Sequence, residues 1–95
     1  MTTEYLNKVR DFFKGKPVLK AYLFGSFSRE EADDNSDVDI LVELDYSVPV
    51  GLEFVKMQLE LQELLERKVD LLTVKSLSKY LTPIINEEKI LIYER

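Results

Sequence analysis

Apolar residues recur along the chain with two different periods, which separate the predicted helices from the predicted strands. Near the N-terminus a spacing of three and four residues predicts a helix, because Thr2 or Thr3 can cap it and Gly15 and Pro17 stop it. The apolar face of this helix carries five side chains: Tyr5, Leu6, Val9, Phe12 and Phe13.

The next segment has the composition of a strand followed by polar connections. Residues 18–24, VLKAYLF, are rich in β-formers and predict a strand that ends at Gly25-Ser26. Residues 27–32, FSREEA, are expected to form a short helix starting near Ser26. Residues 33–36, DDNS, predict a turn.

A strictly alternating segment comes next, at residues 37–44, DVDILVEL, and predicts a half-buried strand. Residues 48–51 then form a loop, and residues 52–66 predict a helix of about four turns. The two faces of the alternating strand are Val38, Ile40, Val42 and Leu44 on one side and Asp37, Asp39, Leu41 and Glu43 on the other.

The last third of the chain predicts one more helix between two extended segments. Residues 67–74 form a third strand, Ser76 can cap a helix that Pro83 kinks or divides, and residues 89–94 form a short strand or an extended tail. This alternating order predicts an α/β (α+β) fold, in which helices pack on one face of a small mixed sheet. With 95 residues, the sequence predicts a single domain, 1–95.

Composition narrows the possible chemistry. The formal net charge of −5 argues against a protein that coats nucleic acid through its phosphates. The chain has neither cysteine nor histidine, so a bound metal would need oxygen ligands, which favours Mg²⁺, Mn²⁺ or Ca²⁺. No apolar run approaches 18 residues and the N-terminus has no signal-peptide pattern, so we expect a cytoplasmic protein without membrane contact.

Two aspartates stand out in the alternating strand. Asp37 and Asp39 point to the same side, about 7 Å apart along the strand. Aspartate is depleted in strands, and a divalent cation would relieve the repulsion between two such carboxylates. The alternative is that this face is exposed to solvent and that the aspartates only add solubility.

Three further features could complete a site. Gly25-Ser26 lies at a strand-to-helix junction, where free backbone amides attract phosphate, and Arg29 lies one turn further on. Arg29 could equally be a surface arginine, and Asp70 in the third strand could be a strand-end residue. If the second and third strands are neighbours, Asp70 joins Asp37 and Asp39. Three carboxylates beside a phosphate-binding turn are typical of two-metal phosphoryl or nucleotidyl transferases.

The run LFGSFSREEADDNSDVDILVEL at residues 23–44 resembles the signature of the minimal nucleotidyltransferases of the DNA-polymerase-β-type superfamily. That signature is Gly-Ser, about ten residues, Asp-x-Asp, and a third carboxylate on a later strand. Here ten residues separate Gly25-Ser26 from Asp37-Val38-Asp39, and Asp70 is in the place of the third carboxylate. The chain departs from the pattern at Phe27 and Glu30, where relatives often have arginine and glycine.

The resemblance implies a set of roles. Asp37, Asp39 and Asp70 would be the catalytic residues and would hold two Mg²⁺ ions, or Mn²⁺, with Asp70 also helping to deprotonate the acceptor hydroxyl. Gly25 and Ser26, with Arg29, would bind the phosphates of the nucleoside triphosphate substrate, ATP.

The resemblance also implies a partner. Minimal members are often paired with a HEPN-domain toxin, act as its antitoxin, and can transfer AMP to a tyrosine of that toxin. Two alternatives stay open: an antitoxin that acts by contact alone, and a nucleotidyltransferase of small molecules such as antibiotics.

The long predicted helix has two apolar stripes. We assign Phe54, Met57, Leu61, Leu64 and Leu65 to the sheet, and a second stripe lies on the opposite side. Either residues 89–94 cover the second stripe or it contacts another protein, namely the toxin or another copy in a homo-oligomer. The second stripe consists of Leu52, Val55 and Leu59.

Overall fold

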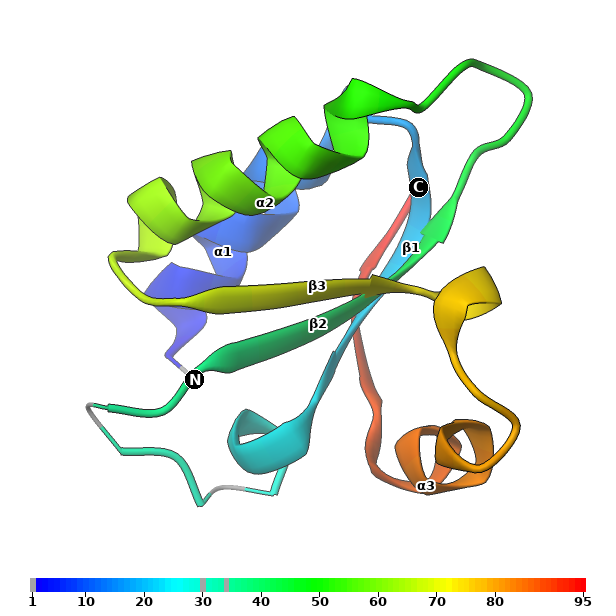
Figure 1. Cartoon of the computed structure of the whole chain (residues 1–95). Helices are drawn as coiled ribbons and strands as arrows, with labels where there is room; N and C mark the ends of the chain where they lie inside the picture. The colour runs from blue at the N-terminus through cyan, green and yellow to red at the C-terminus, as the bar shows by residue number, and fades with distance from the viewer. Residues whose placement is uncertain (1, 30, 34) are drawn as a thin grey trace.

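The computed structural model describes residues 2–29, 31–33 and 35–95 and contains one four-stranded sheet with the strand order β3-β2-β1-β4 (Figure 1). The predicted mixed α+β fold is confirmed. In chain order the elements are α1 (Thr3–Phe13), β1 (Val18–Phe24), the 3-10 turn η1 (Gly25–Phe27), β2 (Val38–Leu44), α2 (Leu52–Leu65), β3 (Val69–Thr73), the 3-10 turn η2 (Val74–Ser76), α3 (Leu81–Glu88) and β4 (Ile90–Glu94).

Helix α1 forms where the sequence predicts it. The Thr2 hydroxyl oxygen accepts a hydrogen bond from the Tyr5 amide at 3.3 Å, which caps the helix. Val9 and Phe13 on its apolar face are completely buried. The helix ends before Gly15, whose φ of 82° suits glycine.

The sheet is mixed because its strands pair in both directions. β1 pairs antiparallel with β2 on one side and with β4 on the other, whereas β2 and β3 run parallel. Residues 38, 40 and 42 of β2 are completely buried and Leu44 nearly so, which confirms the predicted core face. The parallel register places Asp39 directly beside Asp70.

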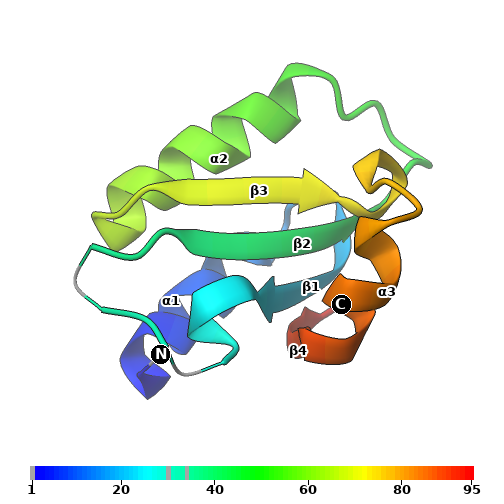
Figure 2. The same ribbon diagram turned by 60° about the horizontal axis from the view of Figure 1, so that its bottom comes forward.

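Helices α1 and α2 pack on one face of the sheet, whereas α3 lies on the other face (Figures 1 and 2). The prediction that the helices share one face is therefore wrong for α3. The position of α3 has a clear physical cause. Leu41 interrupts the polar face of β2 and, with Phe24, forms a small apolar patch. Ile85 of α3 covers that patch and is 4% exposed.

Three local expectations need correction. Ser76 does not cap α3: it forms a capping box with Thr73 around η2, and the Ser78 hydroxyl accepts from the Leu81 amide instead. Pro83 lies in the first turn of α3, where its missing N–H removes no hydrogen bond, so the helix is neither kinked nor divided there. The helix expected at residues 27–32 is reduced to the 3-10 turn η1.

Two residues of the predicted connections, Glu30 and Asp34, lie outside the described residues.

Of the two alternatives for residues 89–94, a short strand or an extended tail, the structure contains the strand, β4. None of the helices in the described part of the chain is long and apolar enough to cross a bilayer.

The two stripes of α2 differ in exposure. Met57, Leu61 and Leu65 are buried against the sheet, whereas Leu64 is 37% exposed and lies outside the core. The second stripe faces solvent, and β4 pairs with β1 rather than covering it, so the alternative in which residues 89–94 cover the stripe is wrong. The exposed fractions are 82% for Leu52, 53% for Val55 and 58% for Leu59.

Candidate active site

The centre of the candidate site is the pair Asp39 and Asp70. They are register partners on the parallel strands β2 and β3, so their side chains leave the same face of the sheet. Burial, followed by the charge of Asp70 and a hydrogen bond to it, raises the pKa of the Asp39 carboxyl to about 6. The charge of Asp37 acts in the same direction, and Arg29 opposes it.

Asp37 lies just before β2 and pairs with Lys68 rather than with Asp70. Its Oδ2 is 3.7 Å from Nζ of Lys68, whose side chain is largely exposed, and the Asp37 side chain is partly exposed. The Val38 amide donates to the Lys68 carbonyl oxygen at 2.9 Å, which ties the starts of β2 and β3 together. Within the described residues, no three acidic side chains converge closely enough to hold a metal ion in this arrangement. The structure therefore brings Asp39 and Asp70 together and leaves Asp37 beside that pair.

Gly25 presses against Asp39 from the end of β1. Its φ is 72°, and a Cβ atom at this position would collide with Oδ2 of Asp39. Only glycine allows the chain to turn so close to the carboxylate. The neighbouring Ser26 is partly buried, and its hydroxyl makes no hydrogen bond to another described residue, which leaves it open to a ligand.

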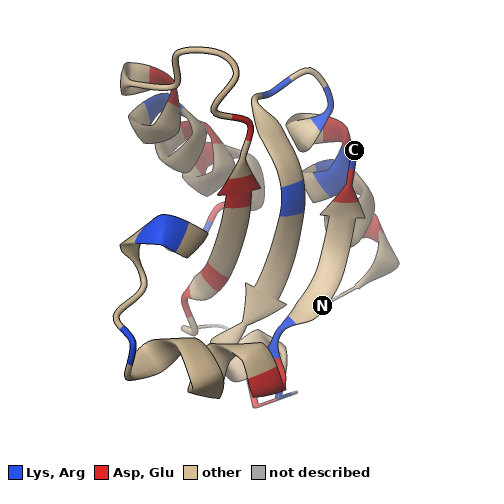
Figure 3. Ribbon diagram, turned by 90° about the vertical axis from the view of Figure 1, so that its right-hand side faces the viewer, with Lys and Arg blue, Asp and Glu red and all other residues tan. Residues whose placement is uncertain are grey.

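Arg29 follows the turn and is held by two carboxylates. Its NH1 donates to Oε2 of Glu88 at 2.7 Å and its Nε to Oε2 of Glu31 at 3.1 Å. These hydrogen bonds, the one to Glu88 first, raise the pKa of the guanidinium. Glu88, which the sequence did not single out, also accepts from the Gly25 amide at 3.1 Å. Figure 3 shows acidic segments on β2 and at the end of α3.

The donor set fits a divalent cation. Asp39 and Asp70 offer only carboxylate oxygens, which are the ligands that Mg²⁺ and Mn²⁺ prefer. The raised pKa of Asp39 arises from burial beside another carboxylate, which a bound cation would counteract. The exposed Asp37–Lys68 pair is weak enough for Asp37 to exchange Lys68 for a metal ion.

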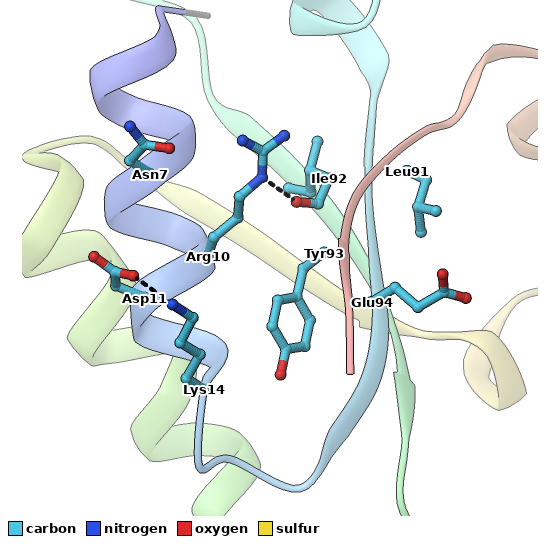
Figure 4. A pocket seen from close by; sticks show the side chains of 8 residues that line it. All are labelled: Asn7, Arg10, Asp11, Lys14, Leu91, Ile92, Tyr93 and Glu94. Atoms are coloured by element: carbon cyan, nitrogen blue, oxygen red, sulfur yellow. Dashed lines mark hydrogen bonds and ion pairs between the residues drawn. The ribbon is translucent and has the colours of Figure 1, made fainter.

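A separate hollow lies on the opposite edge of the sheet, between α1 and β4 (Figure 4). It contains no residue of the candidate site. Arg10 crosses it, and its Nε donates to the Ile92 carbonyl oxygen at 2.7 Å, so this side chain holds the edge strand against the helix. Lys14 on its rim pairs with Asp11 at 3.2 Å. These contacts give the hollow a structural role.

Comparison with known proteins gives one clear family. The family model described as nucleotidyltransferase domain matches residues 4–92. A candidate protein adenylyltransferase of Methanocaldococcus jannaschii is 38% identical over 92 residues, a match that covers 94% of this chain and 92% of that protein.

Solved structures share the fold. A toxin–antitoxin crystal structure with AMP-PNP matches with a TM-score of 0.80 at 24% identity, covering 95% of this chain and 73% of the other. A complex of a tri-AMPylated HEPN toxin with its MNT antitoxin, from Shewanella oneidensis, matches with a TM-score of 0.76 at 22% identity, covering 100% of this chain and 74% of the other.

Proposed function

Because this chain belongs to the nucleotidyltransferase domain family, we propose that it is a minimal member that transfers AMP from ATP to a hydroxyl group of a partner protein. The observation that carries the proposal is the Asp39–Asp70 pair with Gly25 pressed against it. The M. jannaschii relative, a candidate protein adenylyltransferase, supports protein as the acceptor.

The reaction depends on a divalent metal. Asp39 and Asp70 would hold Mg²⁺ or Mn²⁺, and Asp37 would complete the set in place of its contact with Lys68. When bound, two such ions neutralise the charge on the phosphates and on the attacking and leaving oxygens.

The turn after β1 receives the triphosphate. The Ser26 hydroxyl donates to a phosphate oxygen, and the close approach of Gly25 to Asp39 brings that phosphate next to the carboxylates. Arg29 adds a positive charge on the same side of the site, since it already acts on Asp39.

Asp70 acts on the acceptor. Its carboxylate takes the proton from the acceptor hydroxyl, whose oxygen forms a bond to the α-phosphorus of ATP. The bond from that phosphorus to the bridging oxygen breaks, and pyrophosphate leaves with the electron pair. The products are the AMP ester of the acceptor and pyrophosphate.

The partner we propose is a HEPN-domain toxin, with this chain as its antitoxin and a tyrosine of the toxin as the acceptor. The S. oneidensis complex, which joins an AMPylated HEPN toxin to an MNT antitoxin on the same fold, supports this choice. The structure with AMP-PNP supports ATP as the nucleotide. The exposed stripe Leu52, Val55 and Leu59 offers an apolar surface for the toxin or for a second copy.

The test uses the purified chain with α-labelled ATP, Mg²⁺ and any HEPN-domain protein found to be encoded beside it. We expect label on the HEPN protein, at a tyrosine found by mass spectrometry, and no label when EDTA replaces Mg²⁺. Neutralisation of the toxin without any label would support the contact-only antitoxin. Label on an antibiotic but not on the protein would support the small-molecule enzyme, and either result would overturn the proposal.

A further inference from the structure

A carboxylate from the end of the chain reaches the turn that receives the phosphates. Glu88 is the last residue of α3, and its side chain is only 19% exposed. Its Oε1 accepts from the Gly25 amide at 3.1 Å, and its Oε2 accepts from NH1 of Arg29 at 2.7 Å. One carboxylate therefore binds two groups of the connection between β1 and β2.

Gly25 and Arg29 are themselves joined. The Gly25 carbonyl oxygen accepts from the Arg29 amide at 3.2 Å, and from the amide and hydroxyl of Ser28 at 3.1 Å and 2.8 Å. The Gly25 amide, the Arg29 guanidinium and Glu88 thus close a ring of hydrogen bonds. A displacement of Glu88 would move the turn and the arginine together.

The other side of the turn faces the carboxylate pair. Gly25 has no space for a Cβ atom against Oδ2 of Asp39, so its position relative to Asp39 is closely limited. The turn is consequently held between Glu88 on one side and Asp39 on the other.

We propose that Glu88 is a positioning residue that fixes the Gly25-Ser26 turn and Arg29 at the distance from Asp39 that the triphosphate requires. The inference rests on the proposed nucleotidyl transfer. Glu88 acts through Gly25 and Arg29, and both of its oxygens are already engaged there. The test distinguishes this role from the opposite one, in which Glu88 occupies the place of a phosphate and must leave before ATP binds. The two roles predict effects of opposite sign on the affinity for ATP.

The experiment compares Glu88→Gln and Glu88→Ala with the wild type in the transfer assay. Gln keeps an oxygen for the Gly25 amide but loses the charged pair with Arg29, whereas Ala loses both contacts. We expect kcat/KM to fall about tenfold for Gln and further for Ala, mainly through KM for ATP. Glu87→Gln is the matched control, because Glu87 is exposed on the same helix and the change in charge is equal. Its kcat/KM should equal that of the wild type.

A readout independent of activity follows the contact itself. The chain has three glycines, so the Gly25 amide signal is easily resolved in a ¹H–¹⁵N spectrum. Glu88→Ala should remove the exchange protection of the Gly25 amide and leave the signals of Gly15 and Gly51 in place, which also shows that the variant is folded. In an Arg29→Gln background, Glu88→Gln should cause no further loss of kcat/KM, because the pair that it breaks is already absent.

The outcomes are distinct. Tighter binding of Mg²⁺–ATP by Glu88→Gln in calorimetry would overturn the positioning role in favour of competition with phosphate. If kcat/KM is unchanged in both Glu88 variants although the Gly25 signal is altered, the contact between Glu88 and Gly25 is only structural. That result would also overturn the positioning role of Glu88. If the wild type transfers nothing, the proposed function fails, and the affinity for Mg²⁺–ATP then decides whether Glu88 positions a nucleotide site.

Discussion

Asp39 and Asp70 face each other across the only parallel strand pair in the described sheet. Without a bound cation, the ionised form of Asp39 lowers the stability of the folded protein, because burial and the neighbouring carboxylate both raise the pKa of Asp39. A fold that keeps two carboxylates in this position gains stability when a divalent ion binds between them. Stability and activity should therefore respond to Asp39 in opposite directions.

Replacement of Asp39 by asparagine should abolish transfer while the protein stays folded. The change preserves the size of the side chain but removes a charge that we propose holds the metal, so we expect a loss of about a thousandfold in kcat. The transfer assay measures this, and circular dichroism confirms the fold. Glu43→Gln, on the same face of β2 but further from the site, is the matched control and should keep full activity. An Asp39→Asn protein with the wild-type rate would refute the role of Asp39.

The metal-free stability of the wild type should fall as the pH rises. Asp39 titrates near pH 6 in the folded chain and near its ordinary value of 3.8 when unfolded, so its ionised form is disfavoured by folding. This cost is absent below pH 4 and complete above pH 6. In EDTA, Asp39→Asn should therefore melt at a higher temperature than the wild type at pH 7, and the difference should vanish at pH 4.

Asp45→Asn provides a control of opposite sign. Hydrogen bonds from Ser47 and Arg95 lower the pKa of Asp45 to about 2, so its ionised form is favoured by folding. That variant should be less stable than the wild type above pH 4, with the difference lost as the pH falls toward 2. Melting curves of both variants from pH 2 to pH 8 test the pair of predictions. A difference for Asp39→Asn that does not change with pH would contradict the first.

The close approach of Gly25 to Asp39 predicts a strong effect of one methyl group. Gly25→Ala combines a positive φ with a collision against Oδ2 of Asp39, whereas Gly15→Ala has a similar φ and open space around the new Cβ. Backbone strain alone should cost each variant about 1–2 kcal/mol. The collision should make Gly25→Ala less stable than Gly15→Ala and reduce transfer in that variant only. Chemical denaturation and the transfer assay measure the two effects, and equal losses in both variants would contradict the collision.

The sequence predicts correctly the features that depend on local patterns of residues. The alternation of residues 37–44 predicts both β2 and its buried face, and the spacing from Gly25 to Asp39 follows from the chain itself. The sequence predicts contact between Asp39 and Asp70 only if β2 and β3 are neighbouring strands. The structure shows that they are, with Asp39 and Asp70 as register partners. The position of α3 had a signal in Leu41, an apolar residue on the acidic face, but a single residue does not specify which helix will cover it.

Contacts between distant segments could not be predicted in this way. Glu88 lies 63 residues from Gly25, and the sequence around it, NEEK, reads as an ordinary polar helix end. Its approach to the turn depends on the packing of α3 over Leu41 and Phe24. The pairing of Asp37 with Lys68 likewise depends on the ladder between β2 and β3 rather than on the motif.

The exposed stripe of α2 predicts a contact with a partner. Leu52, Val55 and Leu59 are each more than half exposed, although each would contribute about 1.5–3 kcal/mol if buried. The double change Val55→Glu with Leu59→Glu should dissociate the complex with the proposed HEPN-domain partner, because two charges would be buried without partners. The isolated chain should keep its melting temperature, since Met57, Leu61 and Leu65 hold the helix from its other side.

The matched control for this stripe is a change in charge without a change in apolar surface. Lys79→Glu, at an exposed position before α3, lowers the net charge by the same two units and should leave the complex intact. Size-exclusion chromatography with light scattering distinguishes the complex, a homo-oligomer and the free chain. If the double variant dissociates a homo-oligomer but still binds the toxin, the stripe joins copies of this chain. If the double variant stays folded and binds the toxin at unchanged affinity, the toxin contacts another surface. The best candidate is then the acidic face around Asp39 and Asp70, because the proposed acceptor hydroxyl must bind there to react.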